Sequence, residues 1–172
     1  MLTLGYTSVP ALLKYLRHAE ALGLDLGAAR SAAGVTLEDL ADNGRRIPSE
    51  AHERLLQHLM QVSGDPLFGL HSARYVQPGS WSVLGYITMN CATLGEAMSR
   101  IVPYEKLVGD MGTSRLEMAG DHVRLIWNCR HESAGIRRHM VENVLASWLL
   151  YAPGSPTPSI RRAKSGSSTR NR

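Results

Sequence analysis

The chain has 172 residues, of which 44% are hydrophobic, and it carries 19 Lys and Arg against 15 Asp and Glu. This length is typical of one domain with its own apolar core, and the longest apolar stretch, residues 144–152, is too short to cross a bilayer. The basic excess lies in the last 20 residues, so the nearly neutral remainder does not favour direct recognition of DNA.

The sequence also indicates a compartment. The first ten residues lack the basic start and apolar run of a signal peptide, so we expect a cytoplasmic protein. The two cysteines, Cys91 and Cys129, have no CxxC partner and are expected to be reduced, buried thiols.

The first 63 residues predict a layer of helices. Apolar residues recur with helical spacing from Val9 to Leu16, after Ser8 as N-cap, and Gly23 is placed to end this helix. Further helices are predicted at residues 26–33, ended by Gly34, and at residues 49–63, after a linker at 45–48. Between them, Thr36 and Asp39 resemble a capping box that opens one or two more helical turns. A helix-turn-helix reading of residues 24–34 offers only Arg30 to contact bases, so we favour a simple helical layer.

The middle of the chain continues this pattern. An element at 67–75 follows the break at 64–66, then a loop at 77–80 and a helix at 81–89. Thr93 and Glu96 form a capping box that opens another helix. Its predicted core face consists of Leu94, Ala97, Met98, Ile101 and Val102.

The hydrophobic period then changes from helix to strand. Leu116 and Met118, followed by Val123, Leu125, Trp127 and Cys129, alternate with polar residues around a turn at 119–121. This predicts a β-hairpin with one buried face. The helix expected at 133–152 has a wide apolar face that should pack on the hairpin. The fold class is therefore α+β: a helix-rich single domain with a small antiparallel hairpin packed on helices.

The last segment differs in kind from the rest. Residues 153–172 hold three Pro, five Ser and five Lys or Arg, with one large apolar side chain. Such a stretch cannot bury enough apolar surface to offset its ordering entropy. We therefore expect a folded domain at 1–152 and a disordered basic tail at 153–172.

Several short motifs carry a family resemblance over residues 7–152. They are Gly64-Asp65-Pro66 with Gly69-Leu70, Leu84-Gly85-Tyr86, Thr93-Leu94 with Glu96-Ala97, Tyr104, and Arg138, Glu142 and Leu145-Ala146. In this order and spacing they resemble the N-terminal, arabinose-binding-type effector-sensing domain of AraC/XylS-family bacterial transcription regulators, in the branch of ornithine-utilisation and virulence regulators.

The resemblance implies a set of partners. A small organic effector would bind between hairpin and helices, the domain would form a homodimer or a mixed dimer with an intact relative, and DNA would be bound only through a C-terminal helix-turn-helix domain absent from this chain. The domain at 1–152 is then expected to be incomplete at its C-terminus. A frameshifted or truncated product and a natural basic tail both remain open.

The sequence predicts neither an enzyme nor a cofactor. It lacks the nucleophile elbow, the phosphate-binding loop and the HExxH motif. Cys129, His131 and His139 are the best metal cluster, but a fourth ligand at a recognised spacing is missing, so we predict no metal site. His131 and His139 are expected to be solvated.

Six residues are candidates for ligand binding. The aromatic residues are Trp81, Tyr86, Tyr104 and Trp127, each of which also suits a plain core position. Arg138 and Glu142 stand four apart on one helix face, where they would form a surface ion pair, or one of them would point into the effector pocket. In the pocket, Arg138 would bind a carboxylate.

A different class of function stays open as the alternative. A stand-alone interaction module would use the basic tail to contact an acidic partner or nucleic acid, and its binding would weaken sharply with added salt. Effector binding by the folded body would not depend on salt or on the tail.

Overall fold

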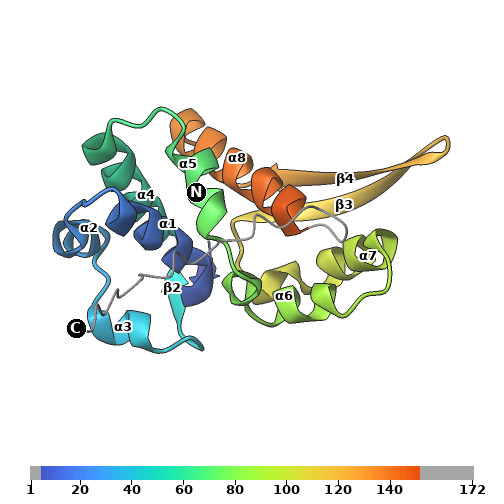
Figure 1. Cartoon of the computed structure of the whole chain (residues 1–172), viewed down its shortest axis with the longest axis horizontal. Helices are drawn as coiled ribbons and strands as arrows, with labels where there is room; N and C mark the ends of the chain where they lie inside the picture. The colour runs from blue at the N-terminus through green and yellow to red at the C-terminus, as the bar shows by residue number, and fades with distance from the viewer. Residues whose placement is uncertain (1–4, 152–172) are drawn as a thin grey trace, which may run out of the picture.

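The computed structural model describes residues 5–151, shown in colour in Figure 1. In chain order the elements are β1 (Tyr6–Ser8), α1 (Val9–Ala21), α2 (Leu26–Ala33), α3 (Leu37–Ala41), β2 (Arg46–Pro48), α4 (Ser49–Ser63), α5 (Phe68–Ser72), the 3-10 turns η1 (Ala73–Tyr75) and η2 (Pro78–Trp81), α6 (Ser82–Met89), α7 (Leu94–Tyr104), η3 (Glu105–Leu107), β3 (Gly112–Ala119), β4 (His122–Cys129) and α8 (Ala134–Tyr151). The predicted α+β class is confirmed. The tail predicted at 153–172 lies outside the described residues.

The predicted helix boundaries in the first half are close to those observed. α2 ends at Gly34, whose φ of 69° is the left-handed conformation that glycine adopts without strain. α3 begins with the predicted capping box, in which Thr36 and Asp39 satisfy each other's backbone N–H groups. Ser8 occupies the N-cap of α1 but makes no side-chain cap hydrogen bond. Within residues 5–151, no helix is long and apolar enough to span a bilayer.

The linker predicted at 45–48 is wrong, because residues 46–48 form strand β2. It pairs antiparallel with β1, with Thr7 opposite Ile47, and the Ile47 side chain is buried. Thr7 also bridges Gly109, which ties the start of the chain to the loop before the hairpin. A three-residue strand is too short to show an alternating pattern, so the sequence did not reveal it.

The main core joins the N-terminal helices to the last one. Its buried apolar side chains come from α1, α2, α4, α5 and α8 and include Leu12, Tyr15, Leu55, Leu59, Phe68 and Met140. Figure 1 shows α5 between the N-terminal helices and α8. The helices α6 and α7 and the hairpin lie on the opposite side of α5 from the N-terminal helices. α2 packs on α4, α5 on α8, and α6 on α7.

Two histidines that the sequence predicts to be solvated are buried. Nδ1 of His131 lies 3.0 Å from Oε2 of Glu53 on α4. His139 faces α5, where its Nδ1 accepts a hydrogen bond from the backbone N–H of Gly69. His139 is buried because its face of α8 packs on α5, and His131, in the segment between β4 and α8, is buried against α4. Cys91 and Cys129 are free thiols as predicted, but each is half-buried rather than buried.

The hairpin forms as predicted, but its apolar face is only partly covered. β3 and β4 pair in full register from Gly112 opposite Cys129 to Ala119 opposite His122. Figure 1 shows the hairpin extending away from the helices. Met118 near the tip is therefore 77% exposed, and Leu116 and Val123 are also exposed, contrary to the predicted buried face. α8 contacts β4, as predicted, but packs more extensively on α5.

The segment before the hairpin also departs from prediction in detail. The loop predicted at 77–80 coincides with the 3-10 turn η2. At the start of α7, Thr93 accepts the backbone N–H of Glu96, whereas the Glu96 carboxylate accepts the N–H of Ala92 instead of closing the predicted box. Leu94 and Val102, predicted to be core, are exposed, while Ala97 is buried.

Candidate functional site

An apolar groove of about 250 Å³ lies where α6, α7, β4 and α8 come together. Among the described residues, nine of the ten lining side chains are apolar or aromatic: Trp81, Leu84, Leu94, Ala97, Met98, Ile101, Leu125, Trp148 and Leu149. The tenth, Thr88, uses its hydroxyl to donate to backbone carbonyls of its own helix. Concave apolar surfaces of this kind are typical of small-molecule sites.

The groove explains why Leu94 of α7 is exposed where the sequence predicts core, whereas Val102 does not line it. Leu94, Ala97, Met98 and Ile101 follow the i, i+3, i+4, i+7 spacing of one helix face, and all four line the groove. The predicted apolar face of α7 therefore exists, but part of it borders an open cavity. Sequence periodicity predicts which residues share one face of a helix, but it does not predict what packs against that face.

A smaller cavity of about 70 Å³ shares walls with the groove. Trp81, Leu84, Ile101 and Trp148 line both, so the two cavities are adjacent. The inner cavity differs in character, because it is also lined by three side chains that carry charge or a hydroxyl group: Lys14, Glu105 and Ser114. The apolar groove thus borders a smaller cavity with a more polar lining.

Lys14 is the most unusual of these side chains. Only 4% of it is exposed, and among the described residues its ammonium group makes no hydrogen bond or ion pair, lying 5.2 Å from the centre of the Tyr15 ring. Burial lowers the pKa of Lys14 from 10.5 to about 7. A lysine buried without a hydrogen bond or ion pair is costly to protonate, which makes Lys14 a candidate for function.

The other two polar groups are also incompletely satisfied. Oε1 of Glu105 accepts the backbone N–H of Ser114 at 2.9 Å. Its second oxygen, Oε2, and the Ser114 hydroxyl are buried without a hydrogen-bond partner among the described residues. Buried polar atoms are nearly always paired, so these atoms are available to a bound molecule.

The structure distributes the six predicted ligand-binding residues over several places. Trp81 lines both cavities and Trp127 lines the inner one. Tyr86 and Tyr104 are exposed and are not among the lining residues of either cavity. Arg138 and Glu142 form an ion pair with 2.7 Å between Nε and Oε1, and Arg138 is 57% exposed.

Two important side chains were not among the predicted candidates. Trp148 belongs to the wide apolar face predicted for the last helix, and Lys14 lies within the apolar run of the first. A lysine between leucines on a helix looks like an ordinary solvated residue, so only the fold reveals its burial. The tryptophans are a sequence signal that could have located the cavities, because all three in the chain line one or both of them.

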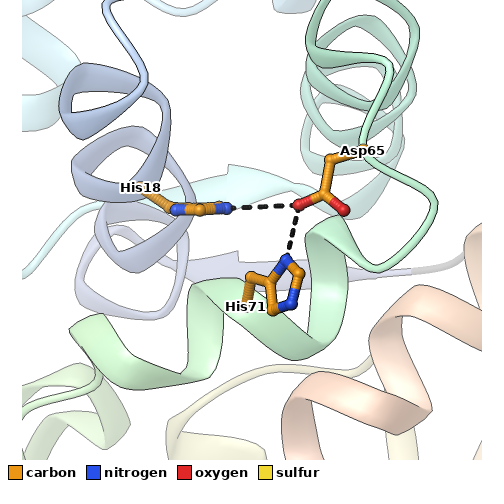
Figure 2. A group of neighbouring side chains, drawn as sticks. All are labelled: His18, Asp65 and His71. Atoms are coloured by element: carbon orange, nitrogen blue, oxygen red, sulfur yellow. Dashed lines mark hydrogen bonds and ion pairs between the residues drawn. The ribbon is translucent and has the colours of Figure 1, made fainter.

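A separate cluster has the composition of a metal site. Within the described part of the chain, the group of three side chains suited to hold an ion is His18, Asp65 and His71, drawn in Figure 2. None of them lines the groove or the inner cavity. The trio considered from sequence, Cys129, His131 and His139, does not form such a group among residues 5–151.

Comparison with known proteins identifies the family. Residues 23–154 match the family described as the arabinose-binding domain of AraC transcription regulators, N-terminal. A search of the curated proteins gives no match. The matched range contains α2 to α8, and therefore every element that lines the groove. The chain belongs to the family of N-terminal, arabinose-binding domains of AraC transcription regulators.

Proposed function

We propose that this chain is the effector-sensing part of an AraC-type regulator and that its effector is a small organic anion with an apolar body. The body would lie in the groove, against Trp81, Leu84 and Trp148. The anionic group would reach the inner cavity and meet the ammonium of Lys14. The proposal agrees with the family, which is a ligand-sensing regulatory domain and not an enzyme family.

The observation that carries this proposal is the buried ammonium at the inner end of an apolar groove. An anion beside Lys14 would offset the desolvation that the side chain suffers in the free protein. The Ser114 hydroxyl could donate to the same anion, because its oxygen has no partner among the described residues. The Glu105 carboxylate would disfavour an anion at its own position, which limits where the charged group can lie.

Trp81 and Trp127 are thus proposed as contacts of the effector, in line with the prediction from sequence. A role for Tyr86, Tyr104, Arg138 or Glu142 remains a prediction, and it would require an effector that extends beyond the two cavities. Lys14 takes the role that the sequence analysis considered for Arg138, that of binding a carboxylate.

Effector binding has a direct route to the rest of the domain. α8 contributes Trp148 and Leu149 to the groove and also packs on α5. A ligand that moves α8 would therefore also change the packing of α8 on α5. We propose that this shift, worth about 1–3 kcal/mol of coupling, is what a regulator of this family would transmit to its DNA-binding part. Dimerisation through exposed apolar side chains such as Leu145 on α8 is part of the same proposal.

The test uses two molecules with the same apolar body and a charged or an uncharged head group, phenylbutyrate and phenylbutyramide. Each is titrated into the full chain while tryptophan fluorescence is recorded, because all three tryptophans line the cavities. We expect the carboxylate to bind about tenfold or more tightly than the amide, and Lys14→Met to abolish this preference. Arg138→Met serves as the matched loss of a surface cation and should keep the preference.

A second pair of variants tests the groove itself. Ala97→Phe fills the groove from α7 and should abolish the fluorescence response, whereas Ser99→Phe adds the same ring to the exposed side of that helix and should not. Loss of the carboxylate preference in Arg138→Met, or equal binding by the Ala97→Phe variant, would overturn the proposal.

A further inference from the structure

The side chains of His18, Asp65 and His71 converge from three separate parts of the chain. His18 is on α1, Asp65 is in the loop between α4 and α5, and His71 is on α5. Figure 2 shows both imidazole rings directed at the same carboxylate. Oδ2 of Asp65 lies 2.7 Å from Nδ1 of His71 and 3.7 Å from Nε2 of His18.

Only one carboxylate oxygen of Asp65, Oδ2, faces the two histidines, because the other is bound by the backbone. Oδ1 accepts the backbone N–H of Leu67 at 2.9 Å, which fixes the orientation of the carboxylate. A ligating carboxylate held in this way by a second group is a recurrent feature of metal sites.

No hydrogen bond among the described residues compensates for the burial of the His18 imidazole. The residue is 4% exposed, its ring packs against Phe68 and Tyr75, and neither ring nitrogen has a hydrogen-bond partner among the described residues. The 3.7 Å to Asp65 is too long for a hydrogen bond. It is close to the separation of about 3.3 Å expected for two ligand atoms at 2.0–2.1 Å from one tetrahedral ion.

We propose that His18, Asp65 and His71 bind a divalent transition-metal ion, with Zn²⁺ as the best fit. The three ligand atoms lie within 4.8 Å of one another, close enough to share an ion after small movements of the side chains. Two imidazoles and one carboxylate suit zinc and leave the fourth tetrahedral position to water. The ion would replace the proton between His71 and Asp65, and that proton would move to the other ring nitrogen of His71 or leave to solvent.

The site is accessible and would fasten the N-terminal helices together. The His71 side chain is 37% exposed, which gives the ion a path from solvent. Bound metal would link α1 to the α4–α5 loop and to α5, and α5 in turn packs on α8. This inference does not depend on the effector proposal, since neither cavity is lined by any of the three ligands.

The test uses the untagged, full-length chain, stripped with a chelator and dialysed. Zn²⁺ is titrated by calorimetry, and bound zinc is counted by mass spectrometry after gel filtration. We expect one zinc ion per chain and a higher melting temperature, with the affinity reduced about tenfold or more in Asp65→Asn and in His71→Gln. His122→Gln removes an exposed histidine near the hairpin turn and is the matched control.

Cobalt substitution reports the ligands directly, and circular dichroism of each variant shows whether it is folded. The Co²⁺ spectrum should be that of a tetrahedral nitrogen and oxygen site and should disappear in His71→Gln, whose partly exposed side chain can change without unfolding the domain. Zinc binding that persists unchanged in both ligand variants would overturn the proposal. So would a thiolate-to-cobalt absorption band, which would place the ion at a cysteine, or the absence of bound zinc in the unmutated chain.

Discussion

The backbone N–H of Gly69 donates a hydrogen bond of 2.9 Å to Nδ1 of His139, and this contact joins α5 to α8. Burial lowers the pKa of His139, which keeps the ring neutral and Nδ1 free to accept. The neighbouring Asn143 donates to the carbonyl oxygen of the same glycine at 3.1 Å. The two helices approach so closely that a Cβ on Gly69 would collide with the backbone carbonyl of His139.

Gly69→Ala should therefore separate α5 from α8. We expect a loss of about 1–3 kcal/mol in the free energy of unfolding, measured by urea denaturation, because the helices can relieve the overlap only by moving apart. Gly135→Ala on α8 is the control, since a Cβ there meets nothing within 4 Å. It should be neutral or gain up to about 1 kcal/mol. Equal effects of the two substitutions would contradict the close contact.

Lys14→Met should stabilise the domain while it removes the anion contact. The pKa of Lys14 is about 7 in the folded chain and 10.5 when unfolded, so between these values the unfolded chain binds more protons and stability rises with pH. Below pH 7 the folded chain bears the full cost of the buried charge. We expect the variant to gain roughly 1 kcal/mol or more near pH 6 and to lose the rise between pH 7 and 10.

The matched control for Lys14 is Lys106→Met, at an exposed position. It should change neither the stability near pH 6 nor its dependence on pH by a measurable amount. A Lys14→Met variant that is less stable than the unmutated chain at pH 6 would show that the ammonium has a partner and would contradict the buried, unpaired state.

His52 should contribute to loss of stability in acid. It is buried, and burial, followed by the charges of Lys14 and His131, lowers its pKa from 6.5 to about 3. Between these values only the unfolded chain takes up the proton, so stability falls as the pH decreases. His52→Phe keeps a ring beside Tyr15 and should reduce the slope by up to about 1.4 kcal/mol per pH unit between about pH 6 and 4.

Chemical denaturation at a series of pH values measures this slope. His122→Phe, which changes an exposed histidine, should leave it as it is in the unmutated chain. An unchanged slope in His52→Phe would mean that His52 is already protonated, or accessible to solvent, in the folded state.

The Arg138–Glu142 pair should contribute little to stability. The two groups lie 2.7 Å apart on one face of α8, but Arg138 is mostly exposed. A double-mutant cycle of Arg138→Ala and Glu142→Ala should give a coupling energy of about 0.3–0.5 kcal/mol, as for other surface pairs four residues apart. A coupling energy several times larger would indicate a structural role that the exposure of Arg138 does not support.

The sequence was sufficient to predict the helices and the hairpin. Local signals define them: Gly34 ends α2, Thr36 and Asp39 cap α3, and the alternation around the turn at 119–121 defines β3 and β4. Strand β2 was missed because a three-residue strand carries no period. The exposed face of the hairpin was misjudged because alternation shows which residues share a face and does not show whether another layer covers it.

The candidate sites depended on contacts between distant parts of the chain. Lys14 lies 91 residues from Glu105 in sequence, and both line the inner cavity. His18 and Asp65 likewise come together only through the packing of α1, α4 and α5. Trp81 and Trp127, which line the cavities, are among the candidates from sequence because they are aromatic residues of the predicted helices and hairpin. The burial of Lys14 had no such local signal.

Hydrogen–deuterium exchange of the full chain, with and without saturating phenylbutyrate, tests most directly whether the effector binds in the groove. We predict that protection will be confined to the elements that line the two cavities: η2, α6, α7, η3, β3, β4, α8 and the part of α1 that carries Lys14. α2 and α3, which line neither cavity, should exchange at the same rate in both samples. Protection that falls on α2 and α3 instead, or no change at the groove elements, would contradict the account.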